Sequence, residues 1–321
     1  MTHTITVIPG DGIGAEVIPA AVAVLEALDL PLVFQHAEAG FGVFERCGEA
    51  LPAETLAACA MSDAVLFGAT SSPMTHVAGY RSPILALRRH FDLYANLRPA
   101  VGEGIDLLIV RENTEGLYSG RERLEDGGAT AIAERVITAR ASERIARIAC
   151  EQARRRCGRL TVVHKANVLK ETCGLFRRVA LDVAAEYPDL AVDELLVDAA
   201  AMWLARDPGR FDVIVTTNLF GDILSDLAAG LTGGLGLAAS ANLGQGWPAL
   251  FEPVHGSAPD IAGQGVADPR AAILSAALLL DYLGYSAEAE RVRRAAYGTP
   301  HTGDTGATAR AVIAALREAA P

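Results

Sequence analysis

"FDVIVTTNLFGDILSDLAAGL", residues 211–231, joins a short apolar run rich in β-branched residues directly to a helical pattern. Similar apolar runs recur along the chain, and most alternate with alanine-rich helical patterns at 15–28, 141–156 and 271–283. The other runs read "ITVIPG", "AVLFGA", "DLLIVREN", "RLTVVHKAN" and "DELLVDA". This alternation is typical of α/β proteins and predicts a largely parallel sheet.

Polar residues stand at the ends of most of these runs. Ligands of open α/β sheets bind beyond the carboxyl ends of the strands, so we expect a functional site to form from these residues. They are Arg111-Glu112-Asn113, His164-Lys165-Ala166-Asn167, Asp198 and Thr217-Asn218.

The length and composition narrow the class of protein. A chain of 321 residues favours two lobes, and the glycine-rich stretch 230–246 suggests a flexible crossover between them. The net charge of −11, without clustered basic and aromatic residues, argues against a nucleic-acid partner. We find no targeting pattern and no apolar stretch of membrane-spanning length, and the five cysteines lack a C-x-x-C pair. We therefore expect a soluble, cytoplasmic protein with reduced thiols and no membrane partner.

Two aspartates mark the start of the helix predicted after 211–217. Asp222 and Asp226 lie four residues apart, so their carboxylates project from one helical face and repel each other. A cation between them would offset this cost, and hard oxygen ligands favour Mg²⁺ or Mn²⁺. Two independent acids favoured by the helix dipole are an equally good interpretation of the spacing alone.

Basic residues supply a second signal. Arg88, Arg98 and Arg111 occur in "SPILALRRHFDLYANLRP" and "LLIVRENTEGLY", and a group of arginines beside a metal suits a substrate with several carboxylates. Each arginine alone is more often an ordinary surface cation, so the functional interpretation depends on their grouping with the other motifs. Lys165 and Lys170 are the only lysines, and a lysine can lose its proton at neutral pH whereas an arginine cannot. We expect chemistry at Lys165 and a surface position for Lys170.

The glycines of "VIPGDGIGAEV", residues 7–17, raise the question of a nucleotide-binding loop. Gly10, Gly12 and Gly14 read G-x-G-x-G, whereas the dinucleotide fingerprint requires G-x-G-x-x-G. We therefore predict a tight glycine turn between a first strand and a first helix.

Taken together, several long motifs resemble the β-decarboxylating dehydrogenases, which include isocitrate, 3-isopropylmalate, homoisocitrate and tartrate/malate dehydrogenases. These motifs are "GDGIG", "YANLRP", "VRENTEGLY", "HKANVLK", "TTNLFGDILSDLAAGLTGGLG" and "FEPVHGSAPDIAG". The resemblance spans nearly the whole chain and implies the two-lobed isocitrate/isopropylmalate dehydrogenase-like fold, with a large mixed, mostly parallel sheet that is not a Rossmann fold. It implies a large cofactor-binding domain from 1–96 and 247–321. Residues 97–246 would form a small domain with the dimer interface and an arm near 119–136.

The resemblance also implies the catalytic and metal-binding residues. Asp222 and Asp226 match metal ligands for Mg²⁺ or Mn²⁺, and Asp198 of the other subunit matches a third. Lys165 matches the catalytic base, and a nearby divalent cation would lower its pKa for this role. Tyr118 matches the residue that returns a proton to the product. The matched substrate-binding residues are Ser72, Leu85, Arg88, Arg98, Arg111 and Asn167.

The cofactor loop of the family corresponds to "EPVHGSAPDIAG", residues 252–263. Its matched residues are His255, Gly256, Ser257, Ala258, Asp260 and Ile261, and Asp268 stands where the family has an adenine-contacting asparagine. Asp260 and Ile261 replace the lysine and tyrosine with which NADP-dependent relatives bind the 2′-phosphate. A carboxylate there repels that phosphate, so the resemblance implies NAD.

The substrate prediction is finer and rests on the segment "GYRSPILALRRHF". Its core, "YRSPILALRR", resembles fungal homoisocitrate dehydrogenases, and "VRENTEGLY" resembles the bacterial type. Leu85 stands where some bacterial relatives carry an arginine, and Arg81 lies one helical turn away. We predict NAD-dependent oxidative decarboxylation of homoisocitrate to 2-oxoadipate in lysine biosynthesis. Isocitrate and 3-isopropylmalate are the alternative substrates, because one pocket methylene discriminates by only about 1 to 3 kcal/mol.

The oligomeric state and one rival function also follow from the resemblance. The family builds its site from two chains, which implies a homodimer or a dimer of dimers with shared active sites. Some hetero-oligomeric relatives contain non-catalytic regulatory subunits, and this is the alternative of another class. Such a subunit would lack part of the Tyr118, Lys165 and aspartate set, which this chain retains.

Overall fold

The computed structural model describes residues 2–246 and 248–318 and divides the chain into two compact units. Unit 1 comprises Met1–Leu93 and Gly234–Pro321, and unit 2 comprises Tyr94–Gly233. Each unit is an α/β structure with its own part of a mixed, mostly parallel sheet. The predicted fold class is therefore confirmed.

Unit 1 contains five strands in the order β2, β1, β3, β12, β11. Only β11 among them runs antiparallel to its neighbour β12, whereas β1, β2, β3 and β12 are parallel. The strands are β1 (His3–Gly10), β2 (Leu32–His36), β3 (Ala64–Ala69), β11 (Ala239–Leu243) and β12 (Ala249–Pro253). All six residues of β3 are buried, which explains its continuous apolar run.

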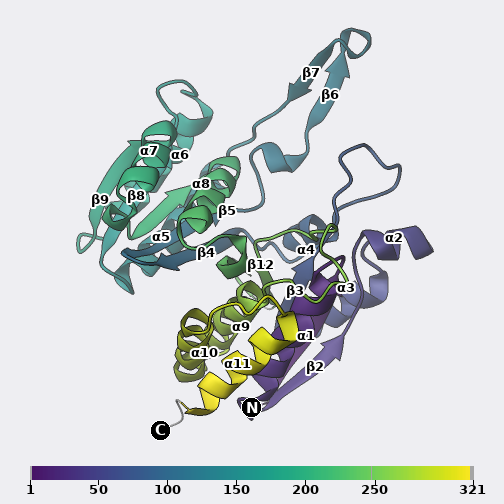
Figure 1. Cartoon of the computed structure of the whole chain (residues 1–321). Helices are drawn as coiled ribbons and strands as arrows, with labels where there is room; N and C mark the ends of the chain where they lie inside the picture. Colours follow the sequence, from purple (N-terminus) through teal and green to yellow (C-terminus); the bar gives the residue numbers. More distant parts are fainter. Residues whose placement is uncertain (1, 247, 319–321) are drawn as a thin grey trace. The chain divides into compact units, whose positions relative to one another are not determined.

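Helix α9 (Arg270–Tyr282) is the central helix of unit 1. It packs against α1, α10, β11 and β12, and Figure 1 shows α9, α10 and α11 gathered beside α1. The other helices are α1 (Gly14–Glu26), α2 (Phe41–Cys47), α3 (Ala53–Ala60), α4 (Pro83–His90), α10 (Ser286–Gly298) and α11 (Thr305–Glu318).

The glycine turn between β1 and α1 is present as predicted. Gly10 and Gly12 have φ angles of 77° and 57°, the left-handed region that favours glycine. A Cβ on Gly10 would lie 1.9 Å from the carbonyl oxygen of Ala69, and one on Gly12 would lie 2.0 Å from that of Ser257. Close backbone approach therefore requires glycine at both positions.

In unit 2, five strands belong to the main sheet in the order β4, β5, β10, β8, β9, and among them only the pair β4 and β5 is antiparallel. The strands are β4 (Ala95–Gly102), β5 (Ile105–Glu112), β8 (Arg159–His164), β9 (Ala191–Leu196) and β10 (Val213–Thr216). Alternate residues such as Leu107, Ile109 and Ile214 pack with α7 (Val197–Arg206) and α8 (Asn218–Leu231) in one core. Helix α5 (Ala139–Arg154) contacts β5, β8 and β10, and α6 (Thr172–Ala184) contacts α5 and β8.

A hairpin of β6 (Glu122–Glu125) and β7 (Thr130–Ala133) extends from unit 2 in Figure 1. Its base closes where Gly116 pairs with Val136. The boundary between the two units, at Gly233 and Gly234, lies within the glycine-rich stretch 230–246, where a crossover was expected. The later part of this stretch forms β11, whose first four residues are buried. All five cysteines are free thiols, as expected.

Candidate active site

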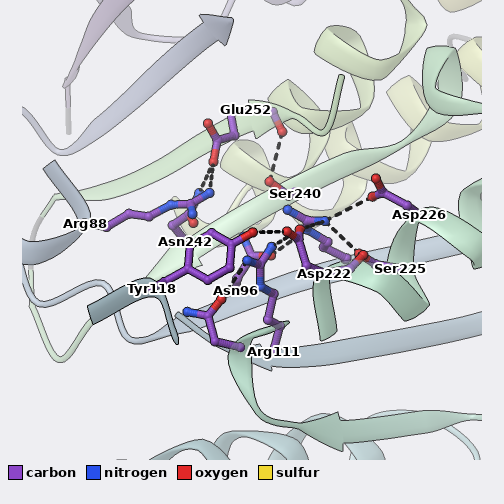
Figure 2. Close-up of polar contacts among 12 residues, drawn as sticks. Arg88, Asn96, Arg111, Tyr118, Asp222, Ser225, Asp226, Ser240, Asn242 and Glu252 are labelled. Carbon is purple, nitrogen blue, oxygen red and sulfur yellow. Dashed lines mark hydrogen bonds and ion pairs between the residues drawn. The ribbon is translucent and has the colours of Figure 1, made fainter. Parts of the chain in front are cut away.

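A cluster of two arginines and two aspartates lies in unit 2. Arg98 on β4 points its Nη1 atom at Asp222 Oδ1 (3.2 Å), Asp226 Oδ1 (3.3 Å) and the hydroxyl of Ser225 (2.7 Å). Arg111 on β5 pairs with the same Oδ1 atom of Asp222. Figure 2 shows Asp222 between Arg111 and Tyr118, with Asp226 beside it on α8.

The helical spacing explains how both aspartates reach one cation. Asp222 and Asp226 are one turn apart on α8, and the Arg98 guanidinium bridges them. Burial raises the pKa of Asp226, Asp222 raises it further, and Arg98 opposes both effects. The pair therefore accommodates positive charge, and its oxygen donors fit a hard divalent cation.

The two carboxylates supply only part of a metal coordination set. Within the described ranges, we find no group of three or more His, Cys, Asp or Glu side chains that would hold a metal ion. Asp226 is the more accessible carboxylate, with its side chain 54% exposed against 29% for Asp222. A metal bound here would need ligands from substrate, water or another chain.

Tyr118 belongs to the same cluster. It lies in a short 3₁₀ turn, Leu117–Ser119, and its hydroxyl donates a hydrogen bond to Asp222 Oδ2. The Arg111 guanidinium lies 5.0 Å from the centre of its ring. Burial and the hydrogen bond to Asp222 raise the pKa of the Tyr118 hydroxyl, so it keeps its proton at neutral pH.

Lys165 and Asp198 form a second group in unit 2. Lys165 follows β8, and its Nζ lies 2.5 Å from Asp198 Oδ1 in the first turn of α7. The hydrogen bond from Lys165 lowers the pKa of Asp198. Asn167, two residues after Lys165, is exposed. The structure thus places the predicted base and the predicted third metal ligand in direct contact within one chain.

In unit 1, Arg88 on α4 is buried and bonded. Its Nη2 lies 2.7 Å from Glu252 Oε1, and the same oxygen accepts a hydrogen bond of 2.9 Å from Asn242 (Figure 2). Leu85 lies one turn before Arg88 and is partly buried, whereas Ser72 is exposed.

The predicted cofactor loop follows β12 in unit 1. Burial lowers the pKa of His255, so its imidazole is neutral near pH 7, and its Nδ1 lies 3.0 Å from the carbonyl oxygen of Gly256. Ser257 is buried, and Ala258 adopts a φ of 40°, a left-handed conformation that is uncommon outside glycine. Strain of this kind is frequent at ligand-binding sites.

The remaining predicted cofactor residues differ in their environments. Asp260 is exposed, and its backbone oxygen accepts a hydrogen bond of 2.8 Å from Gln264. Ile261 is partly buried. Asp268 pairs with Arg270 at 2.7 Å and caps the backbone of that residue, so its carboxylate is engaged at the start of α9.

One neighbour of the arginines was predicted, and two were not. Asn218, expected in the site from its place at a strand end, accepts a hydrogen bond of 2.7 Å from Arg111 Nη2. Asn96, which was not predicted, accepts one of 2.7 Å from Arg98 Nε. The signal for Asn96 was its position two residues before Arg98, which places both side chains on one face of a strand. Glu252 carried no such signal, because its partner Arg88 is 164 residues away.

Glu115, in the segment "VRENTEGLY", was also not singled out. Its carboxylate accepts hydrogen bonds from the backbone N–H and hydroxyl of Thr138, the N-cap of α5. Burial raises its pKa to about 7, and the negative charge of Glu112 contributes. This contact ties the two ends of the arm together beside Tyr118.

The Glu115→Gln variant is expected to remove a pH dependence of stability. A carboxyl group whose pKa is higher in the folded than in the unfolded state destabilises the fold as pH rises between the two values, here between about 4.5 and 7. The penalty at pH 7.5 is about 2 kcal/mol after allowance for solvent screening. Urea unfolding at pH 5 and pH 7.5 should therefore show the variant gaining stability relative to the unmodified protein as pH rises. Glu134 is exposed, and Glu134→Gln is the matched control. If the free energy of unfolding changes equally with pH in both variants, Glu115 is not the residue with the raised pKa.

Comparison with known proteins places these groups in context. The family described as isocitrate/isopropylmalate dehydrogenase matches residues 4–312. The isocitrate/homoisocitrate dehydrogenase of Thermus thermophilus is 53% identical over 333 residues, which cover 99% of each chain. The 3-isopropylmalate dehydrogenase of Archaeoglobus fulgidus is 54% identical over 302 residues, covering 91% of this chain and 89% of the relative.

A solved structure shows the same fold. The isocitrate dehydrogenase of Methylococcus capsulatus superposes with a TM-score of 0.93 at 43% identity, covering 98% of this chain and 100% of that one. None of the helices described is both long and apolar enough to cross a membrane. The family and these relatives indicate a dehydrogenase of the β-decarboxylating type. The chain therefore belongs to the isocitrate/isopropylmalate dehydrogenase family.

Proposed function

We propose that this protein catalyses the NAD-dependent, metal-assisted oxidative decarboxylation of homoisocitrate in lysine biosynthesis. The observation that carries the proposal is the contact of Arg98 and Arg111 with Asp222 and Asp226. Guanidinium groups beside a pair of carboxylates suit a substrate whose own carboxylates bind next to a divalent cation. The name of the Thermus relative supports homoisocitrate or isocitrate as the substrate.

The residues of this chain have distinct roles in the proposed reaction. Arg88, Arg98 and Arg111 bind substrate carboxylates, and Ser72 and Asn167 contribute hydrogen bonds. The Lys165 amine accepts the proton of the substrate hydroxyl, and the Tyr118 hydroxyl delivers a proton to the substrate carbon that loses CO₂.

The two cofactors supply what side chains cannot. NAD would supply the hydride acceptor, and Mg²⁺ or Mn²⁺ held by Asp222 and Asp226 would supply positive charge beside the substrate oxygen. Residues 255–258, with Asp260, Ile261 and Asp268, would hold NAD. The neutral His255 imidazole and the left-handed backbone at Ala258 support this assignment.

Asp260→Ala is expected to weaken the preference for NAD over NADP. The carboxylate repels a 2′-phosphate and bonds the ribose hydroxyls, so its removal should narrow the ratio of kcat/KM values about tenfold. Steady-state kinetics with each cofactor would measure this. Asp182→Ala, an exposed aspartate on α6, is the control and should retain the original ratio. If Asp260→Ala keeps the original ratio of kcat/KM for NAD to that for NADP, another residue determines the cofactor preference.

We also propose a cytoplasmic homodimer with a shared active site. Helices α7 and α8 expose Met202, Ile223 and Leu231, with 43%, 58% and 38% of their surfaces accessible. Apolar side chains in this number on adjacent helices are typical of an interface between chains. Asp222 and Asp226 supply only part of a metal coordination set. This fits a site to which a partner subunit contributes Asp198 and Lys165.

3-Isopropylmalate is the alternative substrate that a specific observation favours. Leu85 is apolar and lies one turn before Arg88, where an isopropyl group would pack. A leucine cannot pair with the longer carboxylate arm of homoisocitrate, and Arg81 would have to supply that charge.

NADH formation with homoisocitrate, isocitrate and 3-isopropylmalate in parallel tests the proposal, each with Mg²⁺ and with a chelator. Metal-dependent turnover with the highest kcat/KM for homoisocitrate is the expected result. A higher kcat/KM for 3-isopropylmalate would show that Leu85 sets the substrate specificity of the pocket. Absence of turnover with all three would favour a non-catalytic subunit.

A further inference from the structure

The carboxylate of Asp11, in the glycine turn after β1, bonds two segments that are distant in sequence, the start of α2 and the loop after β3. It accepts hydrogen bonds from the backbone N–H groups of Phe41 (2.7 Å), Gly42 (2.9 Å) and Ser71 (2.8 Å). A Cβ on Gly40 would lie 2.6 Å from this carboxylate, so the loop approaches it as closely as glycine allows. Hydrogen bonds to a carboxylate are about twice as strong as neutral ones, so Asp11 fixes both segments firmly.

The same turn also reaches the proposed cofactor loop. The Ser71 hydroxyl donates a hydrogen bond of 2.9 Å to the Ser257 hydroxyl, and the backbone N–H of Ile13 donates one of 2.9 Å to the Ser257 carbonyl oxygen. Ser257 is thus held through both its side chain and its backbone, immediately before the strained Ala258.

The contacts form a continuous path from Asp11 through Ser71 to Ser257. Ser71 precedes the proposed substrate residue Ser72, and Ser257 is a proposed cofactor residue. We propose that Asp11 is a positioning residue that sets the cofactor loop and the substrate loop in register with each other. This inference rests on the proposed function, and it gives the "GDGIG" motif a role that its glycines alone do not explain.

Asp11→Asn is expected to raise KM for NAD and for the hydroxy acid on the order of tenfold, with a much smaller change in kcat. The amide keeps the size of the side chain but directs its own N–H₂ group at one or more of the backbone donors. The start of α2 and the loop at Ser71 then lose the carboxylate that holds them together. Lys165 and Tyr118, which lie in unit 2, make no contact with this carboxylate among the hydrogen bonds described. Initial rates over a matrix of both substrate concentrations separate the KM values from kcat.

Two further variants separate positioning from simple stabilisation. Asp63→Asn is the matched control, because Asp63 accepts a hydrogen bond of 2.8 Å from the Thr4 backbone at the opposite end of β1. It should lower the melting temperature without raising either KM. Ser71→Ala retains the Asp11 contacts and removes only the bond to Ser257. It should raise KM for NAD severalfold at an unchanged melting temperature.

The outcomes distinguish the inference from the proposed function. If the unmodified protein turns over and Asp11→Asn lowers only its melting temperature, the positioning role is overturned while the proposed function stands. Equal KM increases in Asp63→Asn and Asp11→Asn would also overturn it. Absence of turnover in the unmodified protein would overturn both.

Discussion

Lys165→Met should lower kcat by about 10³-fold or more while leaving the fold intact. Lys165 lies at the carboxyl end of β8 with its ammonium 2.5 Å from Asp198, and no packing of the core depends on it because its side chain is partly exposed. Methionine retains much of its length without an ionisable group. General-base catalysis contributes about 10² to 10⁴ in rate, and here the same group also supplies charge beside the substrate.

The chain offers a close control for this prediction. Lys170 is the other lysine, lies five residues further along and is exposed, so Lys170→Met makes the same chemical change outside the proposed site. It should retain the normal rate. Single-turnover NADH formation measures the loss, and far-ultraviolet circular dichroism verifies the fold. If Lys165→Met forms NADH at a near-normal rate, Lys165 is not the general base.

Most of the strands that were predicted are largely buried. Strands β1, β3, β5, β8 and β10 read as continuous apolar runs, because helices cover both sides of a parallel sheet. Strands β2, β4, β11 and β12 of the sheet were not predicted. Strand β4 contains Arg98 and Pro99, and β11 is "ASANL", whose small and polar residues carry little strand signal. Strands β4 and β11 are each antiparallel to a neighbour, so their place in the sheet depends on tertiary pairing.

The site was predictable where spacing is local. The four-residue separation of Asp222 and Asp226 correctly placed both carboxylates on one face, and it predicted a cation between them. That cation is the Arg98 guanidinium in this structure, a contact across 124 and 128 residues that no periodicity encodes. The contacts of Asp11 with residues 41 and 71 are hidden for the same reason. Sequence patterns identify the chemistry of a side chain, whereas the fold decides which distant partner it meets.

Asp222→Asn should abolish most metal-dependent activity and exceed the effect of Asp226→Asn. Asp222 accepts hydrogen bonds from Arg98, Arg111 and Tyr118, whereas the contact of Asp226 is to Arg98 alone among the pairs described above. Loss of the Asp222 charge leaves two guanidinium groups without their shared counterion, which then oppose a divalent cation electrostatically. We expect Mn²⁺ affinity to fall by about 10²-fold and kcat with it. For the more exposed Asp226, a fall of about tenfold is expected, because solvent screens its charge.

Direct binding separates metal loss from a damaged fold. Mn²⁺ titration of the whole protein by isothermal calorimetry, with and without substrate, gives the affinity independently of turnover. Asp189→Asn is the control, since Asp189 pairs with Arg154 on the surface of unit 2 and should leave Mn²⁺ binding unchanged. If Asp222→Asn binds Mn²⁺ normally, the two aspartates serve only to pair with the arginines. The helix dipole would not explain them, because α8 begins at Asn218 and neither aspartate lies in its first turn.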